Sequence, residues 1–472
     1  MPRRRLRYRD LLALDLAGIL PVGAPIGVAP LIKYAGASAI WPVLLGYAMV
    51  LLSAIPVLEY SRLAAFAGGY YGLAELGLGP TAGKFTALAN YLYYVAWQIQ
   101  NALQAGWIVY SITGSPAAWA GVVAGVLILS YIGAVSPPRA YAADVLLPIL
   151  ASTISVTLAM DLYVVLKSPY NSPAYLYPGD WGAVAVATSV QGFWMFVGYG
   201  TPLFYSEEAE NPRRDIWRSV AAATTISAVV YALSAYAVVA AVPPAEVEAL
   251  SSSPMPYLTA WSRYYPEALL LSYPLLMAPA ALAYGGPTGS HARLLWAMAR
   301  DGFIESRWIE AVDKNGVPRN AATLNLLISA ASAYAVAGAI FITSGVDATA
   351  AEKAWLVAST GATVLWYAHH VLPEVALYPL LRRTKAGVSK MRAVLTGVVA
   401  PAAGAAIFVY TSYELAVHKP LYSSAVYVAA AISAAALAYT FYRRSKGKLG
   451  RSVVAYLAAV SNPPDMGQKT HP

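Results

Sequence analysis

Long stretches of apolar residues recur along the chain, and short polar segments separate them. Six of these stretches contain no aspartate, glutamate, lysine or arginine. Each is long enough to cross a lipid bilayer as a helix, for which about 20 apolar residues suffice. Because lipid offers the backbone no hydrogen-bond partners, we expect helices rather than open sheets. The six uncharged stretches are 117–135, 220–245, 268–290, 321–346, 393–413 and 421–442.

Apolar runs that tolerate one or two charges bring the number of predicted membrane spans to twelve. The sequence therefore predicts an all-α polytopic membrane protein. The composition agrees, because 58% of the residues are hydrophobic and only 12% are charged, about half the charged share of a soluble domain. This composition excludes an ordinary soluble enzyme and a disordered chain. The predicted spans are 11–34, 38–62, 84–111, 117–136, 141–166, 183–205, 216–242, 265–290, 320–344, 353–380, 393–412 and 421–442.

The basic residues predict how these spans are oriented. The N-terminal segment 1–10 and the tail 443–472 are both basic, and twelve crossings place them on the same side. Only five of the 32 lysines and arginines then fall on the opposite side, so both termini are expected in the cytoplasm. The net charge of +9 is explained by this topology and requires no nucleic-acid partner. We expect the basic residues to contact anionic membrane lipids. We expect the protein in the cell (inner or plasma) membrane.

Two of the spans are interrupted by glycine and proline. The first contains the segment 20–27 (LPVGAPIG), and the sixth contains 197–202 (VGYGTP). The interruptions lie five spans apart, as two inverted repeats over 11–166 and 183–380 would place them, with 393–442 as two further spans. Paired interruptions of this kind indicate the central site of a secondary transporter. The alternative is that each is a packing kink, since glycine and proline are common in membrane helices.

An unwound turn in the middle of the membrane has the chemistry to bind a small zwitterion. The N–H groups at the start of a half-helix attract a carboxylate, and carbonyls freed by the unwinding suit an ammonium group. An α-amino acid carries both groups. The sequence contains no cysteine, no clustered metal ligands, no nucleophile motif and no phosphate-binding loop. We therefore expect a protein that is not an enzyme, without catalytic residues, metal or cofactor.

Uncharged polar side chains inside the spans are further candidates. Gln98, Asn101 and Gln104 of the third span repeat every three residues and so share a helix face. They either contact a substrate or form hydrogen bonds between helices. Thr288 and Ser290 of the eighth span are candidate oxygen ligands for sodium. Alternatively, these two hydroxyls bond to their own backbone.

Ionisable side chains inside the spans are candidates for proton coupling, because a charge within the membrane is costly. His369, His370 and Glu374 lie in the tenth span, and His370 is one helical turn before Glu374. Asp144 lies near the start of the fifth span. Histidine titrates close to neutral pH, which suits a proton relay or sensor. Interior histidines that only form structural hydrogen bonds are the alternative.

Four sequence elements resemble segments of the amino acid–polyamine–organocation (APC) transporters. Segment 207–216 (EEAENPRRDI) resembles their E-E-x-x-N-P-x-R-x-I element, and 292–303 (ARLLWAMARDGF), followed by 317–321 (VPRNA), resembles their A-R-x-x-x-x-M-A-R-D-G element. Segment 67–71 (AGGYY) resembles their G-G-x-Y element, and 193–199 (FWMFVGY) their F-x-G-aromatic turn. The chain thus resembles an amino acid permease of this superfamily.

The resemblance implies a leucine-transporter-type fold, in which two inverted repeats of five helices, with helices 1 and 6 broken, are followed by two appended helices. It also implies a secondary active transporter of amino acids or related amines that works by proton-coupled symport or exchange; sodium coupling and polyamine transport are alternatives. The first-span turn would hold the substrate carboxylate and sixth-span carbonyls its amino group. The expected substrate-binding residues are Val22, Gly23, Ala24, Pro25, Trp194, Phe196, Val197, Gly198, Tyr199 and Gly200, together with Gln98 and Asn101 of the third span.

The sequence departs from the family pattern at four places, two of which are Gly200 after the sixth-span turn and Pro287 in the eighth span. Pro25 stands where the first-span turn usually has its second glycine, which removes one N–H donor. The fifth span has no lysine, so the lysine-based coupling of some proton-driven relatives is not implied. A sensor on the same fold, which would bind an amino acid without transporting it, is an alternative of a different class. The short tails favour transport.

Overall fold

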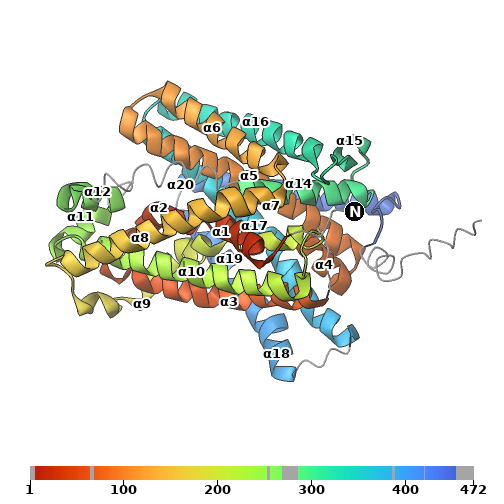
Figure 1. Cartoon of the computed structure of the whole chain (residues 1–472), viewed down its shortest axis with the longest axis horizontal. Coiled ribbons are helices and arrows are strands. Elements are labelled where there is room, and N and C mark those ends of the chain that lie inside the picture. The colour runs from red at the N-terminus through yellow and green to blue at the C-terminus, as the bar shows by residue number, and fades with distance from the viewer. Residues whose placement is uncertain are drawn as a thin grey trace, which may run out of the picture.

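The computed structural model describes residues 6–63, 68–251, 256–267, 285–384, 389–418 and 420–452. Within these residues all the regular elements are helical (Figure 1). The α-helices are α1 (Tyr8–Ile19), α2 (Ala24–Ala35), α3 (Ile40–Leu63), α4 (Tyr70–Leu78), α5 (Pro80–Thr113), α6 (Pro116–Val135), α7 (Pro138–Ala140), α8 (Leu147–Lys167), α9 (Trp181–Ala187), α10 (Pro212–Ala240), α11 (Val247–Ser251), α12 (Pro256–Tyr264), α14 (Gly285–Arg300), α15 (Arg307–Glu310), α16 (Arg319–Ser344), α17 (Ala348–Thr384), α18 (Lys390–Val394), α19 (Ala400–His418) and α20 (Pro420–Ser445).

Seven helical stretches in the described residues are long and apolar enough to cross a membrane. They coincide with seven of the predicted spans, so the chain is a multi-pass membrane protein. The total of twelve spans and the inverted repeat stay predictions, partly because most of the eighth span, at 268–284, lies outside the described residues. The seven stretches are Ile40–Ser61, Pro116–Val135, Pro138–Lys167, Trp181–Tyr205, Pro212–Ala240, Arg319–Ser344 and Ser423–Ser445.

The first predicted span is interrupted between α1 and α2. Leu20 adopts a left-handed conformation (φ 61°, ψ 56°) that a regular helix cannot include, so α1 ends at Ile19. Pro21 then starts a single 3₁₀ turn, Pro21–Gly23, and the α-helix resumes at Ala24. The span therefore consists of two half-helices.

The sixth predicted span is interrupted over a longer stretch. After α9 the chain forms a π-helical turn, Thr188–Gly192, and a 3₁₀ turn, Trp194–Phe196. Val197 is extended (φ −61°, ψ 136°), and Gly198 has a φ of 113° that favours glycine. The chain resumes as a second 3₁₀ helix, Thr201–Tyr205. We call the segments 20–23 and 197–200 the first and second breaks.

The end of α1, just before the first break, lies directly against the second break. A Cβ atom added at Gly18 would overlap Thr201 Oγ1 and would lie 2.6 Å from the carbonyl oxygen of Gly198. Ile19, the last residue of α1 before the first break, is also attached to α10, because the Tyr231 hydroxyl donates a hydrogen bond of 2.9 Å to its carbonyl oxygen. Each backbone break is therefore held by the neighbouring chain, as irregular backbone at membrane depth requires.

Several of the short helices lie at opposite ends of the molecule. Figure 1 shows α11 and α12 close to α9 at one end, and α4 and α15 at the other. Between these ends α5 and α17 pack against each other along much of their length. Two ends separated by long helices are the arrangement that a protein with two aqueous faces needs.

Three of the four segments that resemble the APC transporters, 67–71, 207–216 and 292–303, meet at the α4 and α15 end. Lys84 of α5 is fully buried there, and its Nζ lies 3.5 Å from Glu75 Oε2 and 3.6 Å from Asp301 Oδ2. The Tyr71 hydroxyl donates a hydrogen bond to the same Asp301 carboxylate. A buried lysine is tolerable only with such partners. Two pairs extend this network, Arg293 with Glu208 (2.5 Å) and Arg300 with Glu207 (3.2 Å).

Candidate functional site

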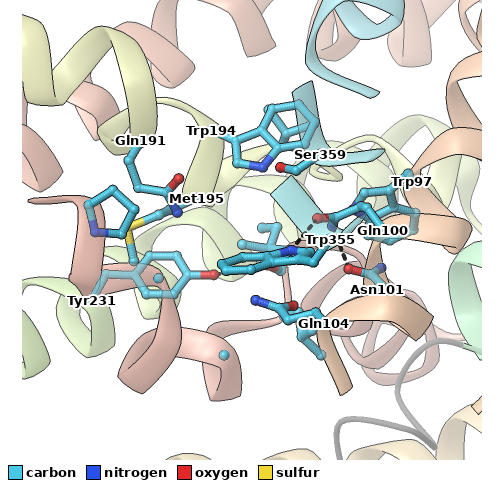
Figure 2. Close-up of a pocket in the computed structure, with 16 residues that line it drawn as sticks. Trp97, Gln100, Asn101, Gln104, Gln191, Trp194, Met195, Tyr231, Trp355 and Ser359 are labelled. Carbon is cyan, nitrogen blue, oxygen red and sulfur yellow. Dashed lines mark hydrogen bonds between the residues drawn. The ribbon is translucent and has the colours of Figure 1, made fainter. Parts of the chain in front are cut away.

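A small cavity that is partly open to solvent lies between the two breaks. Figure 2 shows the tryptophan, glutamine and asparagine side chains that surround it. The lining comes from α1, α2, α5, α10, α17 and the interrupted sixth span, so elements far apart in sequence converge there. The lining residues are Ile19, Leu20, Gly23, Gly27, Pro30, Trp97, Gln100, Asn101, Gln104, Gln191, Trp194, Met195, Val197, Tyr231, Trp355 and Ser359.

Polar contacts organise the wall formed by α5 and α17. Trp355 Nε1 donates a 3.2 Å hydrogen bond to Gln100 Oε1, and Gln100 Nε2 donates one of 2.5 Å to Asn101 Oδ1 (Figure 2). The Trp355 ring is also stacked on Trp107, with 4.9 Å between ring centroids. These contacts fix the amide and indole groups in place. The cavity thus has a rigid polar wall.

The first break contributes backbone to the cavity. A Cβ atom at Gly23 would meet only the Leu20 side chain, at 3.8 Å, so a larger residue at this position would extend into the cavity. Gly27 is tighter, because its Cβ would lie 2.9 Å from Met195 Cε. Ala24 is fully buried and does not line the cavity. The side chains of Val22 and Pro25, also predicted to bind substrate, lie outside the described residues.

The predicted substrate-binding residues of the interrupted sixth span divide into two groups. Trp194 and Val197 line the cavity. Phe196 instead packs between the rings of Tyr47 and Tyr231, at 5.8 and 5.4 Å. The other three lie against neighbouring helices: Gly198 against α1, Gly200 against the Tyr70 hydroxyl, and Tyr199 against His370.

The third-span amides also divide. Asn101 and Gln104 line the cavity, but Gln98 accepts a 3.2 Å hydrogen bond from Ser329 of α16. Gln100, which lies just off the predicted stripe, does line the cavity. Several lining residues were not among the predicted site residues, namely Gln191, Met195, Tyr231, Trp355 and Ser359. Of these, only Gln191 stands out in the sequence, as an amide in an otherwise apolar span.

Among the residues that the structure describes, the lining contains no charged side chain. Its polar groups are four side-chain amides, indole N–H groups, two hydroxyls and the backbone of the breaks. Such a surface can hydrogen-bond a small polar molecule while its tryptophan faces exclude water. It offers no counter-ion to a ligand with a net charge.

The proton-coupling candidates of α17 lie close to the second break. The Tyr199 hydroxyl and His370 Nε2 are 2.6 Å apart, and His370 Nε2 lies 3.4 Å from Glu374 Oε1. His369 points elsewhere, stacking on Tyr93 with its Nδ1 3.2 Å from the carbonyl oxygen of Leu365. All three ionisable groups are buried. One of the two histidines therefore connects a buried carboxyl group to the break.

The remaining candidates are not part of this cluster. Asp144 is exposed in the π-helical turn Tyr141–Leu146 that precedes α8. Ser290 is buried in α14, forms a hydrogen bond with Tyr205 and does not line the cavity. Thr288 belongs to α14, but its side chain lies outside the described residues. Among the residues that the structure does describe, no three His, Asp or Glu side chains are grouped as a metal site would need.

Comparisons with known proteins bear on this architecture. Residues 11–462 match the family described as amino acid permease. The chain is 23% identical over 354 residues to the glutamate/serine transporter AimA of Bacillus subtilis, covering 69% of this chain and only 65% of the relative. It is 28% identical over 331 residues to an uncharacterized transporter of Mycobacterium tuberculosis, covering 66% of this chain and 69% of the relative.

A solved structure has a similar fold. The crystal structure of the Eremococcus coleocola manganese transporter, in complex with an aromatic bis-isothiourea substituted compound, superposes with a TM-score of 0.59. The alignment covers 92% of this chain and 93% of the other at 12% sequence identity. At this identity the similarity concerns the fold alone.

Proposed function

Because the chain belongs to the amino acid permease family, whose model matches nearly its whole length, we propose that it is a secondary transporter of amino acids. Transport proceeds by alternating access, in which the half-helices around the two breaks expose one central site to each side of the membrane in turn. The observation that carries this proposal is the cavity between the two breaks, lined by backbone, amides and tryptophans (Figure 2).

The two breaks provide for the two charged groups of an α-amino acid. The substrate carboxylate approaches the backbone at Gly23, where no side chain blocks the chain. The ammonium group faces the carbonyls near Trp194 and Val197, together with the amides of Gln100 and Asn101. These contacts use neutral dipoles to bind a molecule whose own charges sum to zero.

The uncharged lining also indicates which amino acids are favoured as substrates, according to the charge of the substrate's side chain. Glutamate, arginine and polyamines would each bring an unbalanced charge into a cavity that has no charged lining residue. Burying a neutral polar group without a hydrogen-bond partner costs roughly 2–7 kcal/mol, and burying an unpaired charge costs more. Neutral amino acids such as serine are therefore the favoured substrates, even though AimA, by its name, transports glutamate as well as serine.

Protons are the favoured coupling ion. The Tyr199–His370–Glu374 contacts support this proposal, because they link titratable groups to the second break. Sodium coupling through Thr288 and Ser290 has less support, since Ser290 bonds to Tyr205 away from the cavity.

Counterflow in proteoliposomes tests the transport proposal. Vesicles loaded with unlabelled serine should take up labelled serine and other neutral amino acids in a saturable manner. Labelled glutamate, arginine and putrescine should exchange at least about tenfold more slowly, the factor that corresponds to 1.4 kcal/mol. Protein-free vesicles are the control. A panel of amino acids and amines without any exchange would contradict transport, whereas preferred exchange of glutamate would contradict only the argument from charge.

A further inference from the structure

Asp15 is a buried acidic residue that the proposed site does not use. It lies in α1, less than two turns before the first break, and its exposed fraction is 0%. No side chain in the described residues forms a hydrogen bond with either carboxyl oxygen, and the backbone N–H of Thr201 is the group that approaches the carboxyl group. A fully buried carboxyl group without a side-chain partner is rare in native proteins and calls for an explanation. Inside a membrane span it points to function.

Three buried tyrosines lie in the same region as this carboxyl group. It interacts electrostatically with the hydroxyls of Tyr70 of α4, Tyr94 of α5 and Tyr199 of the second break. The backbone N–H of Thr201 also interacts with this carboxyl group, and it donates a 3.2 Å hydrogen bond to the carbonyl oxygen of Gly198 as well. The buried His291 of α14 packs against the Tyr94 ring, with 3.9 Å between ring centroids, and neither of its ring nitrogens has a hydrogen-bond partner in the described residues.

Tyr70 connects Asp15 to the cluster on α17. Its hydroxyl lies directly against the backbone of the second break, because a Cβ atom at Gly200 would overlap it. Its ring packs edge-on against His370, with 5.0 Å between centroids. His370 in turn contacts both Tyr199 and Glu374. Asp15 on α1 and Glu374 on α17 thus belong to one buried group of titratable side chains that encloses the second break.

We propose that Asp15 is a proton-binding site of the transport cycle and that Tyr70 links it to His370. A proton added to the Asp15 carboxylate gives a neutral carboxylic acid, which suits a buried position without a basic side-chain partner. The proton leaves when movement of α1 opens this region to water. Because α1 carries both Asp15 and the start of the first break, protonation and the position of the break change together. This inference rests on the proposed transport function and adds a second proton site to the His370–Glu374 pair.

A proton fits this position better than a metal cation. Hard cations take several oxygen ligands at once. The groups near Asp15 are phenol hydroxyls on three different elements, and one of them, Tyr199, already contacts His370. A single carboxyl group suffices for a proton.

The test compares Asp15→Asn with Asp10→Asn in reconstituted vesicles. Asp10 is a matched control, because it is also a buried acid of α1 but accepts a 2.9 Å hydrogen bond from the backbone N–H of Arg7. Serine counterflow is measured between about pH 5 and 8, and serine accumulation is measured with an inward proton gradient, each with and without sodium. Asp15→Asn should exchange serine without the pH dependence of the wild type and should lose gradient-driven accumulation. Asp10→Asn should retain both.

Two results separate this inference from the proposed function. If the wild-type protein shows neither exchange nor uptake, the transport proposal fails. If the wild-type protein transports and Asp15→Asn keeps its gradient-driven accumulation and pH profile, only the role of Asp15 is overturned. Accumulation that follows sodium rather than protons would also overturn it.

A second measurement covers the case in which Asp15→Asn does not fold. Infrared difference spectra between acid and neutral pH record the carbonyl band of protonated carboxyl groups. In the conservative variant Asp15→Glu this band should shift relative to the wild type. Spectra of the two proteins that superimpose would show that Asp15 does not titrate and would overturn the proposal.

Discussion

At the scale of single residues, glycines decide how closely the two breaks approach. Gly18 of α1 and Gly198 of the second break face each other. A Cβ atom at Gly18 would overlap the backbone of Gly198, and a Cβ atom at Gly198 would overlap the backbone of Gly18. Gly198 also needs its φ of 113°, which other residues rarely adopt. Gly23 has a different role, because it has ordinary backbone angles and leaves space in the cavity. One class of glycine therefore serves the fold and the other serves the site.

Gly18→Ala should destabilise the protein. The new methyl group would overlap Thr201 Oγ1 and lie 2.6 Å from the carbonyl oxygen of Gly198, so the two breaks must separate. We expect a loss of about 1–3 kcal/mol, typical of overpacking, measured as a lower unfolding temperature in detergent. Gly121→Ala in α6 is the control, since its Cβ meets nothing within 4 Å. Equal unfolding temperatures for the two variants would contradict this packing argument.

Gly23→Phe should leave the fold intact but abolish substrate binding. A side chain at this position meets only Leu20 nearby and extends into the cavity, where it takes the place of the ligand. The variant should unfold at nearly the wild-type temperature without ligand, yet show no thermal shift on addition of serine. Retained serine affinity would mean that the first break is only a kink in the helix.

At the scale of elements, the sequence predicts the breaks better than the faces of the helices. Glycine and proline mark both interruptions, because they change the backbone itself. The rotation of a helix about its axis is set by its neighbours, which one sequence does not specify. Gln98 therefore turns to Ser329, and Gln100 takes its place at the cavity.

The contribution of α17 to the cavity could not be predicted for the same reason. Trp355 and Ser359 lie one turn apart in a span whose ionisable residues, rather than these two, attract attention in the sequence. They reach the cavity because α17 packs along α5, where Trp355 stacks on Trp107 and bonds to Gln100. His370 stands out in the sequence as an ionisable residue, but its 2.6 Å contact with Tyr199 depends on that same packing.

The contact between α17 and the second break gives a prediction about coupling. Tyr199→Phe removes the 2.6 Å contact with His370 Nε2 and keeps the ring. We expect serine counterflow to persist and accumulation driven by a proton gradient to fall, because the site loses its connection to His370 and Glu374. Tyr93→Phe is the matched control, since the Tyr93 hydroxyl is buried without a hydrogen-bond partner in the described residues. Similar accumulation in both variants would contradict a coupling role for Tyr199.

At the scale of the whole molecule, the segment after α20 closes the end that α4 and α15 share. The backbone N–H of Arg451 donates a 2.6 Å hydrogen bond to the carbonyl oxygen of Asp301, and the carbonyl oxygen of Arg451 accepts one of 3.1 Å from Lys84 Nζ. Gly450, with a φ of 81°, lies so close that a Cβ would be 2.8 Å from the backbone nitrogen of Phe303. Residues 446–452 therefore attach the segment after α20 to the buried Lys84 network.

The attachment of this segment should weaken in acid. Hydrogen bonds from Lys448 and Arg443, together with their positive charges, lower the pKa of Glu305 below its ordinary value of 4.5. A carboxyl group whose pKa is lower in the folded protein stabilises it above the unfolded pKa, and this contribution is lost as the pH falls through the folded value. Hydrogen exchange of residues 446–452 should thus be slow near neutral pH and accelerate, beyond the intrinsic pH effect, below about pH 4.5. Glu305→Gln should show the fast exchange already at neutral pH, whereas Glu310→Gln, a nearby exposed acid, should not. If Glu305→Gln exchanged as slowly as the wild type at neutral pH, the backbone contacts of Arg451 alone would hold the segment in place.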